Sequence, residues 1–179
     1  MQIIDTKIEG LKILKPRIFE DSRGKFVKTF TDDFFKENNL NIEIKETYYS
    51  ISKKDVIRGM HFQTPPEDHE KLVYVPRGSI LDVVLDIRKN SPTYGKHVSQ
   101  NLNADNGYMF YIPKGCAHGF LSLEDDTNVT YMQTTMYAPN NDGGINCHSF
   151  GFDWGIKNPI VSERDLSFDT FSEFITPFN

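Results

Sequence analysis

The sequence predicts an all-β fold, a sandwich or barrel of short strands with a few short helices. Strand-like segments rich in β-branched and aromatic residues recur at a spacing of roughly 8–12 residues, which is typical of sandwiches and barrels rather than βαβ units. Turn-forming clusters separate these segments, at 103–107, 113–115, 124–127 and 139–144. The 179 residues contain no repeat, low-complexity run or linker. We therefore expect a single domain over residues 1–179, large enough to bury a core.

The first elements are short. We expect an edge strand at Ile3–Ile4 and a second strand over 11–14. Residues 19–26 predict a turn, where Gly24 supplies conformational freedom, followed by a strand through Phe30. Thr31 is placed to cap a short helix that ends near residue 38, because two aspartates follow it in the first turn.

The middle of the chain holds the most informative stretch. A strand is expected over 42–51, and 56–78 predicts two strands joined by a polar loop with Pro65 and Pro66. Such a hairpin would bring His61 close to Lys71.

The second half continues the strand pattern. Residues 79–88 predict a strand with one wet face, because aspartates and an arginine interrupt its apolar residues. Further short strands are expected over 98–102, 108–112, 117–123 and 128–136. The tail over 162–174 predicts one or two helical turns.

Composition excludes several classes of protein. The net charge of −5 and the lack of a basic stripe argue against nucleic-acid binding. Cys116 and Cys147 do not form a CxxC pair, which argues against a disulfide framework or structural zinc site and favours a reducing cytoplasm. The N-terminal residues predict no signal peptide, and no apolar run is long enough for a membrane span.

His61 is the first candidate for chemistry. It lies between Met60 and Phe62, so it is either a core histidine with both nitrogens satisfied or a general base. Arg58 and Lys71 favour the second interpretation, because two neighbouring cations lower a histidine pKa and keep the ring neutral. A base beside two cations suits an anionic substrate that must lose a proton. For either cation alone, an ordinary solvated surface charge is the favoured interpretation.

The other candidates are weaker on their own. The five histidines form no HxH or HxxxH pair, which argues against a metal site. His118 lies between Gly115 and Gly119 at a strand start, where a ligand or backbone can approach closely; a structural hydrogen bond is the alternative. Tyr131 in mid-strand is typical of a core residue, and Asp165 is typical of a helix cap.

Six collinear motifs nevertheless resemble one family over nearly the whole chain, the dTDP-4-dehydrorhamnose 3,5-epimerase family. They are Asp21-Ser22-Arg23-Gly24, Arg58-Gly59-Met60-His61-Phe62-Gln63 with Lys71-Leu72-Val73, the run from Asp82 to Gly95, Pro113 to Phe120, Tyr137-Ala138-Pro139, and Ser162 to Asp165. The resemblance implies a cupin-type jelly roll, a homodimer, no metal or organic cofactor, and a nucleotide-diphosphate-linked 4-keto-6-deoxy sugar as substrate.

The resemblance also implies residue roles. The base falls on His61, its orienting carboxylate on Asp165, the cation facing the sugar C4 oxygen on Lys71, and the acid on the opposite face on Tyr131. The implied substrate contacts are Arg23, Lys28, Glu46, Thr47, Tyr48, Arg58, His118, Tyr137, Asp142 and Arg164.

The chain departs from the family pattern at the nucleotide end. Lys28 stands where the family usually has Glu, and Glu46-Thr47-Tyr48 replaces a Gln-Asp-Asn run. Neutral sequence drift with a Lys28–Glu46 charge pair is one explanation. A different nucleotide base in the substrate is the other. A carboxylate can accept the two adjacent N–H donors of guanine, so we hypothesise a GDP-linked sugar, such as a 4-keto-6-deoxyheptose. Cys116 replaces the usual aromatic residue before Ala-His-Gly and alters the predicted pocket wall.

Four functions remain distinct at this point. The 3,5-epimerase is favoured by the complete set of His61, Tyr131 and Asp165. An epimerase acting at C3 only, a sugar 3,4-ketoisomerase and an inactive sugar-binding cupin are the alternatives.

Overall fold

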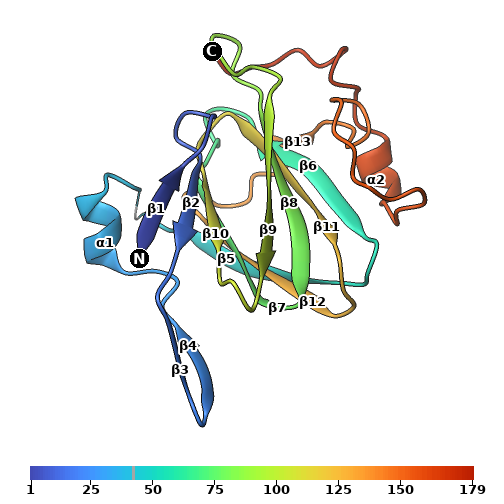
Figure 1. Cartoon of the computed structure of the whole chain (residues 1–179). Coiled ribbons are helices and arrows are strands. Elements are labelled where there is room, and N and C mark those ends of the chain that lie inside the picture. The colour runs from blue at the N-terminus through green and yellow to red at the C-terminus, as the bar shows by residue number, and fades with distance from the viewer. Residues whose placement is uncertain (42) are drawn as a thin grey trace.

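The computed structural model describes residues 1–41 and 43–179. It is an all-β, cupin-type structure in which two antiparallel sheets pack face to face (Figure 1), as predicted. The six-stranded sheet has the order β1 (Gln2–Asp5), β2 (Lys12–Lys15), β10 (Met109–Ile112), β7 (Lys71–Arg77), β12 (Thr127–Gln133) and β5 (Glu46–Ser52). The five-stranded sheet has the order β13 (Asp142–Gly144), β6 (Ile57–Gln63), β11 (Cys116–Ser122), β8 (Ser79–Asp86) and β9 (His97–Asn103).

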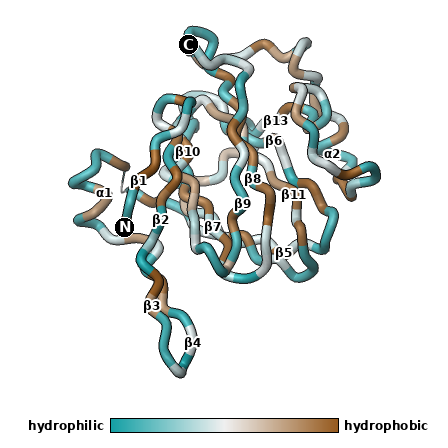
Figure 2. The backbone as a smooth tube through the Cα atoms, viewed as in Figure 1, coloured by the Kyte–Doolittle hydropathy of each residue, from teal (hydrophilic) through white to brown (hydrophobic). Residues whose placement is uncertain are grey.

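The core lies between the sheets and follows the two-residue period of the strands. Val73 and Val75 of β7 face Val84 of β8 and Phe120 of β11, all within one buried cluster. Complete burial of such a side chain stabilises the fold by about 1.5–3 kcal/mol. Figure 2 shows hydrophobic stretches along β8 and β11.

Both outer faces are covered by other segments. The chain after β13 runs over the outside of the five-stranded sheet, where Trp154 and Phe178 are buried, and it contains the short helix α2 (Glu163–Leu166). Helix α1 (Asp32–Glu37) buries Phe35 against β2 and β10 of the other sheet. Thr31 is its N-cap residue, but its side chain accepts no capping hydrogen bond from the backbone of the first turn. In the described chain, neither helix has the length and apolar character needed to cross a membrane.

The predicted hairpin over residues 56–78 is wrong. Strands β6 and β7 belong to different sheets, and the loop with Pro65 and Pro66 crosses from one sheet to the other. Strand β6 pairs with β11 and β13, whereas β7 pairs with β10 and β12. Consecutive strands pair or neighbour only about two-thirds of the time, so adjacency in sequence was a poor guide here.

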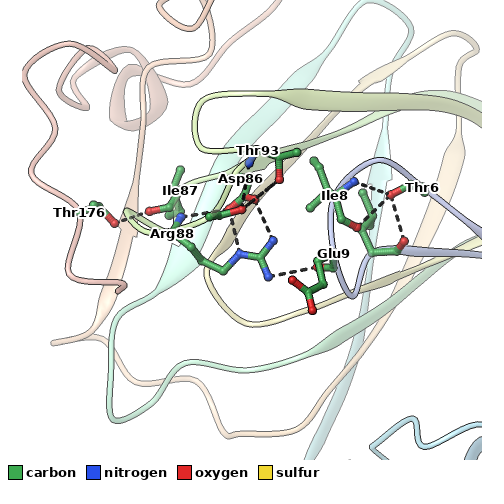
Figure 3. A network of polar contacts seen from close by, with 10 residues as sticks. Thr6, Ile8, Glu9, Asp86, Ile87, Arg88, Thr93 and Thr176 are labelled. Atoms are coloured by element: carbon green, nitrogen blue, oxygen red, sulfur yellow. Dashed lines mark hydrogen bonds and ion pairs between the residues drawn. The ribbon is translucent and has the colours of Figure 1, made fainter.

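The solvent-exposed face predicted for the strand over residues 79–88 is also wrong. Asp82 and Asp86 are fully buried on the inner face of β8. Figure 3 shows how Asp86 is satisfied: its carboxylate accepts hydrogen bonds from Arg88 at 2.9 and 2.8 Å and from Thr93 at 2.6 Å. Arg88 in turn donates to the Glu9 carbonyl at 3.1 Å, which ties the end of β8 to the N-terminal region.

Several predicted boundaries change as well. The strand expected through Phe30 ends at Val27, and the one expected over 128–136 ends at Gln133. The strand expected from residue 42 begins at Glu46, and residue 42 itself lies outside the described residues. The turn cluster at 139–144 contains β13, which pairs with β6.

A two-stranded hairpin projects from the body of the protein. It consists of β3 (Ile18–Asp21) and β4 (Gly24–Val27), and Figure 1 shows it extending away from both main sheets. Its tip is hydrophilic in Figure 2, while Phe19 and Phe26 on its strands are 44% and 59% exposed.

Candidate active site

A cavity of about 380 Å³ opens between the two sheets. Side chains from both sheets and from the segment around α2 line it. They are Glu46, Tyr48, Ser50, Arg58, His61, Phe62, Gln63, His69, Lys71, His118, Phe120, Tyr131, Gln133, Tyr137, Asp142 and Arg164. Most of the residues predicted from the sequence therefore meet in one place.

His61 on β6 is bonded to a carboxylate 104 residues away. Its Nε2 lies 2.9 Å from Asp165 Oδ1, and the other oxygen of Asp165 accepts the Gly59 amide at 3.1 Å. Burial alone would raise the pKa of Asp165, but the His61 and Gly59 hydrogen bonds hold it below its usual value. An ionised carboxylate only accepts, so His61 donates from Nε2 and keeps Nδ1 as a proton acceptor.

Two glycines make this arrangement possible. Gly59 has a φ of +135°, and a Cβ there would lie 2.5 Å from Gly119 Cα on the neighbouring strand. A Cβ on Gly119 would lie 2.7 Å from the Met60 sulfur. The close approach expected around Gly119 is thus present, and it aligns His61 on β6 directly opposite His118 on β11.

His118 forms a second pair with a carboxylate. Its Nε2 lies 2.6 Å from Asp82 Oδ1, and both side chains are almost completely buried. The register places His118 opposite Val84, so Asp82 is its diagonal neighbour on the same face of the sheet. Burial raises the pKa of Asp82, against the opposing effect of His118 and Lys71.

Lys71 approaches the cavity from the opposite sheet. Its side chain on β7 is buried, and this burial lowers the pKa of the ammonium group to about 8. The carboxylates of Asp142 and Asp82 act in the other direction and favour the charged form. A desolvated ammonium group is well suited to stabilise negative charge on a ligand oxygen.

Tyr131 lies on β12 in the same sheet as Lys71. Its ring stacks on Tyr48 of β5 with centroids 4.7 Å apart, because the two residues are direct partners in the strand register. The Tyr131 hydroxyl lies 3.4 Å from Ser50 Oγ. Burial raises the pKa of Tyr131 above its ordinary value, so the phenol keeps its proton at neutral pH.

Polar residues surround the outer part of the cavity. Arg164 Nη2 lies 2.6 Å from Asp142 Oδ2, and Glu46 Oε2 accepts the Tyr137 amide at 2.6 Å and Gln133 Nε2 at 2.9 Å. These bonds hold the Arg164 guanidinium and the Glu46 carboxylate in place beside the cavity.

Four predicted residues do not line the cavity. Asp165 lies behind His61, and Thr47 points to the other face of β5, where its hydroxyl donates to the Tyr131 carbonyl at 3.0 Å. Arg23 sits at the hairpin tip and pairs with Asp21 at 2.6 Å. Lys28 follows the hairpin and is exposed. Among the described residues of one chain no ion pair joins it to Glu46, whose carboxylate is bonded to Gln133 and to the Tyr137 amide instead.

Sequence reasoning missed several lining residues. Ser50 lies two residues after Tyr48, and Gln133 lies two residues after Tyr131. Residues two apart on a strand point to the same face, so the sequence already indicated that both line the cavity. His69 was not predicted at all. Its Nδ1 lies 3.2 Å from Gln63 Nε2, and burial lowers its pKa to about 3, so it is neutral. Cys116 lies beside a small neighbouring cavity with His69 and Lys71.

The assembled groups can move protons. One wall carries a proton acceptor, His61, and the other carries a phenol and an ammonium group, with room for a sugar-sized ligand between them. Among the residues that the structure describes, no cluster of three or more His, Cys, Asp or Glu side chains could hold a metal ion.

Comparison with known proteins agrees with this chemistry. The family model for dTDP-4-dehydrorhamnose 3,5-epimerase matches residues 5–173. Proteins of that name from Methanothermobacter thermautotrophicus and Escherichia coli are each 39% identical, over 96% and 98% of this chain and 95% and 97% of their own lengths. A Legionella pneumophila dTDP-6-deoxy-D-glucose-3,5-epimerase structure in complex with dTDP-4-keto-L-rhamnose is 33% identical, covers 97% of this chain and 94% of that one, and superposes with a TM-score of 0.92.

Proposed function

This chain belongs to the dTDP-4-dehydrorhamnose 3,5-epimerase family, and we propose that it inverts C3 and C5 of a nucleotide-linked 4-keto-6-deoxy sugar. The observation that carries this proposal is the placement of His61 and Tyr131 on opposite sheets around one cavity. Epimerisation needs a proton to leave one face of the sugar ring and another to arrive on the other face.

The first step is proton abstraction. The C4 ketone of the sugar acidifies the C–H bonds at C3 and C5. Nδ1 of His61 takes the proton, while Asp165 holds the ring from Nε2 at 2.9 Å and stabilises the imidazolium that forms. The electron pair of the broken C–H bond moves to the C4 oxygen and forms an enolate.

The second step returns a proton. Lys71 stabilises the enolate oxygen while its charge lasts. Tyr131 then donates its phenolic proton to the carbon from the opposite face, the ketone re-forms, and the centre is inverted. His61 and Tyr131 regain their starting protonation by exchange with solvent.

The nucleotide occupies the outer part of the cavity. Arg58 and Arg164 suit a diphosphate, because a guanidinium group binds two oxygens at once. We propose a dTDP-linked sugar as substrate, because the names of the relatives specify dTDP. A GDP-linked sugar is the second candidate. Glu46 favours it, because Oε2 takes both of the carboxylate's hydrogen bonds in the described chain and Oε1 remains for the guanine N–H donors.

We propose that two copies of the chain form a homodimer. Arg23 and Lys28 lie in or next to the projecting hairpin, outside the cavity of their own chain. A second copy that covers Phe19 and Phe26 would bring both cations to a neighbouring site. The unpaired Cys116 and Cys147 support a reducing compartment, for which we propose the cytoplasm.

Proton exchange in D₂O tests this function. The purified protein is given dTDP-linked and GDP-linked 4-keto-6-deoxy sugars in parallel, and NMR follows the C3 and C5 protons. We expect deuterium at both carbons of the dTDP sugar. Preference for the GDP sugar would indicate that Glu46 recognises guanine. Exchange at C3 alone would make the protein a mono-epimerase. No exchange with either sugar would contradict the proposal and favour a ketoisomerase or a binding protein.

A further inference from the structure

His69 is a buried histidine that the proposed mechanism does not use. It lies two residues before Lys71, where the chain enters β7. Both side chains line the main cavity, and both also line the small neighbouring cavity of about 10 Å³, together with Cys116. A cavity of roughly 10–15 Å³ is large enough for one water molecule, provided that polar groups face it.

Gln63 has no hydrogen left to give to His69. Its Oε1 accepts the Ala138 amide at 2.8 Å, which fixes the orientation of the side-chain amide. Its Nε2 lies 2.8 Å from the Glu67 carbonyl oxygen and 3.2 Å from that of Met136, and a carbonyl can only accept. These two carbonyls use both Nε2 hydrogens, although Nε2 also lies 3.2 Å from Nδ1 of His69.

The tautomer of His69 follows from these bonds. The Thr135 hydroxyl donates to the Glu67 carbonyl at 3.0 Å, so its oxygen accepts from Nδ1 of His69, which lies 3.1 Å away. Nδ1 therefore carries a proton. Burial, with Lys71 nearby, lowers the pKa of His69 to about 3, so the ring carries no second proton. Nε2 is then a bare acceptor, buried and without a partner among the residues that the structure describes.

Lys71 needs an acceptor. An ammonium group has three hydrogens to donate, and burying them unpaired is costly. In the described chain no protein group forms a hydrogen bond with this ammonium; the carboxylates of Asp142 and Asp82 act on it through their charge only. Asp142 is bonded to Arg164, and Oδ1 of Asp82 to His118, each at 2.6 Å. Oδ2 of Asp82 has no partner among the described residues, but Asp82 does not line the small cavity.

We propose that His69 is a positioning residue for Lys71: its Nε2 accepts a hydrogen bond from one water molecule in the small cavity, and that water accepts one from the Lys71 ammonium. The inference deepens the proposed epimerase function, in which Lys71 stabilises the enolate oxygen. The bridge pairs one ammonium hydrogen and leaves the others for the substrate. An acceptor also favours the charged form of Lys71, against the effect of burial.

Titratable groups on several elements face Lys71 or His69. They are Asp82 of β8, Asp142 of β13, His61 of β6, His118 of β11, Tyr131 of β12, and Lys114. The two aspartates favour the charged ammonium, whereas Lys114 disfavours a charge on His69. Burial raises the pKa of the Cys116 thiol to about 12, so it stays neutral in the small cavity. The variants below change none of these groups, so a shift in the titration of Lys71 reports the loss of the His69 acceptor.

NMR of histidine nitrogens tests the tautomer without substrate. In protein labelled with ¹⁵N-histidine, the His69 signals are assigned by their loss in His69→Leu. We expect a protonated Nδ1 and a bare Nε2 from about pH 6 to about pH 8. A protonated Nε2 in the wild type would overturn the inference, whatever the fate of the variants.

NMR of lysine carbons tests the coupling. Protein labelled with ¹³C at lysine Cε reports the ionisation of Lys71, whose signal is assigned by its loss in Lys71→Met. We expect Lys71 to titrate about one pH unit lower in His69→Leu, a tenfold change in the equilibrium, and to shift less in His69→Gln, which keeps an acceptor. Ile112→Val is the matched control, because it changes an apolar side chain of the small cavity and should leave the titration unaltered. An unchanged titration in folded His69→Leu would overturn the inference.

Kinetics distinguish this role from a direct contact with the sugar. In His69→Leu the alkaline limb of kcat should move to lower pH by about one unit, with KM within about twofold of the wild type. A raised KM with an unmoved limb would mean that Nε2 binds the substrate, and would overturn the inference. Failure of the epimerase proposal would look different: the wild type would show no turnover, while the titration of Lys71 would still depend on His69.

Discussion

The two walls of the cavity handle protons in different ways. In the five-stranded sheet, His61 and His118 are each backed by a buried carboxylate. In the six-stranded sheet, Lys71 and Tyr131 form no such pair in the described chain; Tyr131 is buried in a hydrophobic cluster, and Lys71 is buried as well. Burial without a carboxylate keeps the phenol of Tyr131 protonated, whereas an ionised partner equips His61 to accept a proton. In the proposed mechanism, the placement of these groups on opposing sheets sets the direction of proton movement across the sugar.

Removal of the proposed base, His61, should have the largest effect on kcat. His61→Asn keeps a polar side chain of similar size but has no nitrogen that can accept a proton. We expect kcat to fall by about 10³–10⁴-fold, with KM nearly unchanged because binding depends on other groups. A coupled assay of product formation measures this. Activity within tenfold of wild type would place the base elsewhere.

Removal of the Lys71 ammonium group should have the second-largest effect on kcat. Lys71→Met retains the apolar stem and removes the ammonium group, so we expect a loss of about 10²–10³-fold in kcat. In the wild type, activity should also fall as the pH rises through about 8, where Lys71 loses its proton. An alkaline limb that persists unchanged in the slow variant would show that another group is responsible.

The orienting carboxylate should matter less. Asp165→Asn keeps the hydrogen-bonding shape but removes the charge that stabilises the imidazolium form of His61. We expect a loss of about 10–100-fold, larger than the loss in Asp165→Glu if some charge can still reach the ring. Equal losses in the two variants would indicate that geometry, rather than charge, is the contribution of Asp165.

The smallest effect on rate is expected outside both walls. Asp86→Asn weakens the network with Arg88 and Thr93, none of which lines the cavity. Loss of a buried charged acceptor should cost about 2 kcal/mol and lower Tm by roughly 4–8 °C. Calorimetry measures the shift, and kcat per folded molecule should stay at the wild-type value. An unchanged Tm would contradict the structural role of this network.

Much of the fold followed from local patterns. Short strands separated by turn clusters predicted the all-β class, and Thr31 with Asp32 and Asp33 marked the start of α1. The strand pairing could not be read in the same way, because β6 and β7 are consecutive in sequence yet belong to different sheets. Local propensity does not specify which sheet a strand joins.

In the candidate site, too, single residues could be predicted from the sequence but their contacts could not. His61 and Lys71 were recognisable from their residue types, but the contact between His61 and Asp165 spans 104 residues and depends on how the tail folds back over β6. Asp82 was misjudged as part of a wet face because charged residues are rarely buried without a partner. Its partner, His118, lies 36 residues away on another strand.

One experiment tests the division of labour between the walls most directly. Tyr131→Phe is given the 4-keto-6-deoxy nucleotide sugar in D₂O, and NMR follows isotope exchange and inversion separately. If His61 alone removes the proton and Tyr131 alone returns one on the other face, deuterium should still enter the sugar while inversion slows by about 10²-fold. If exchange and inversion slow equally, the two walls do not divide the proton transfers, and the account is wrong.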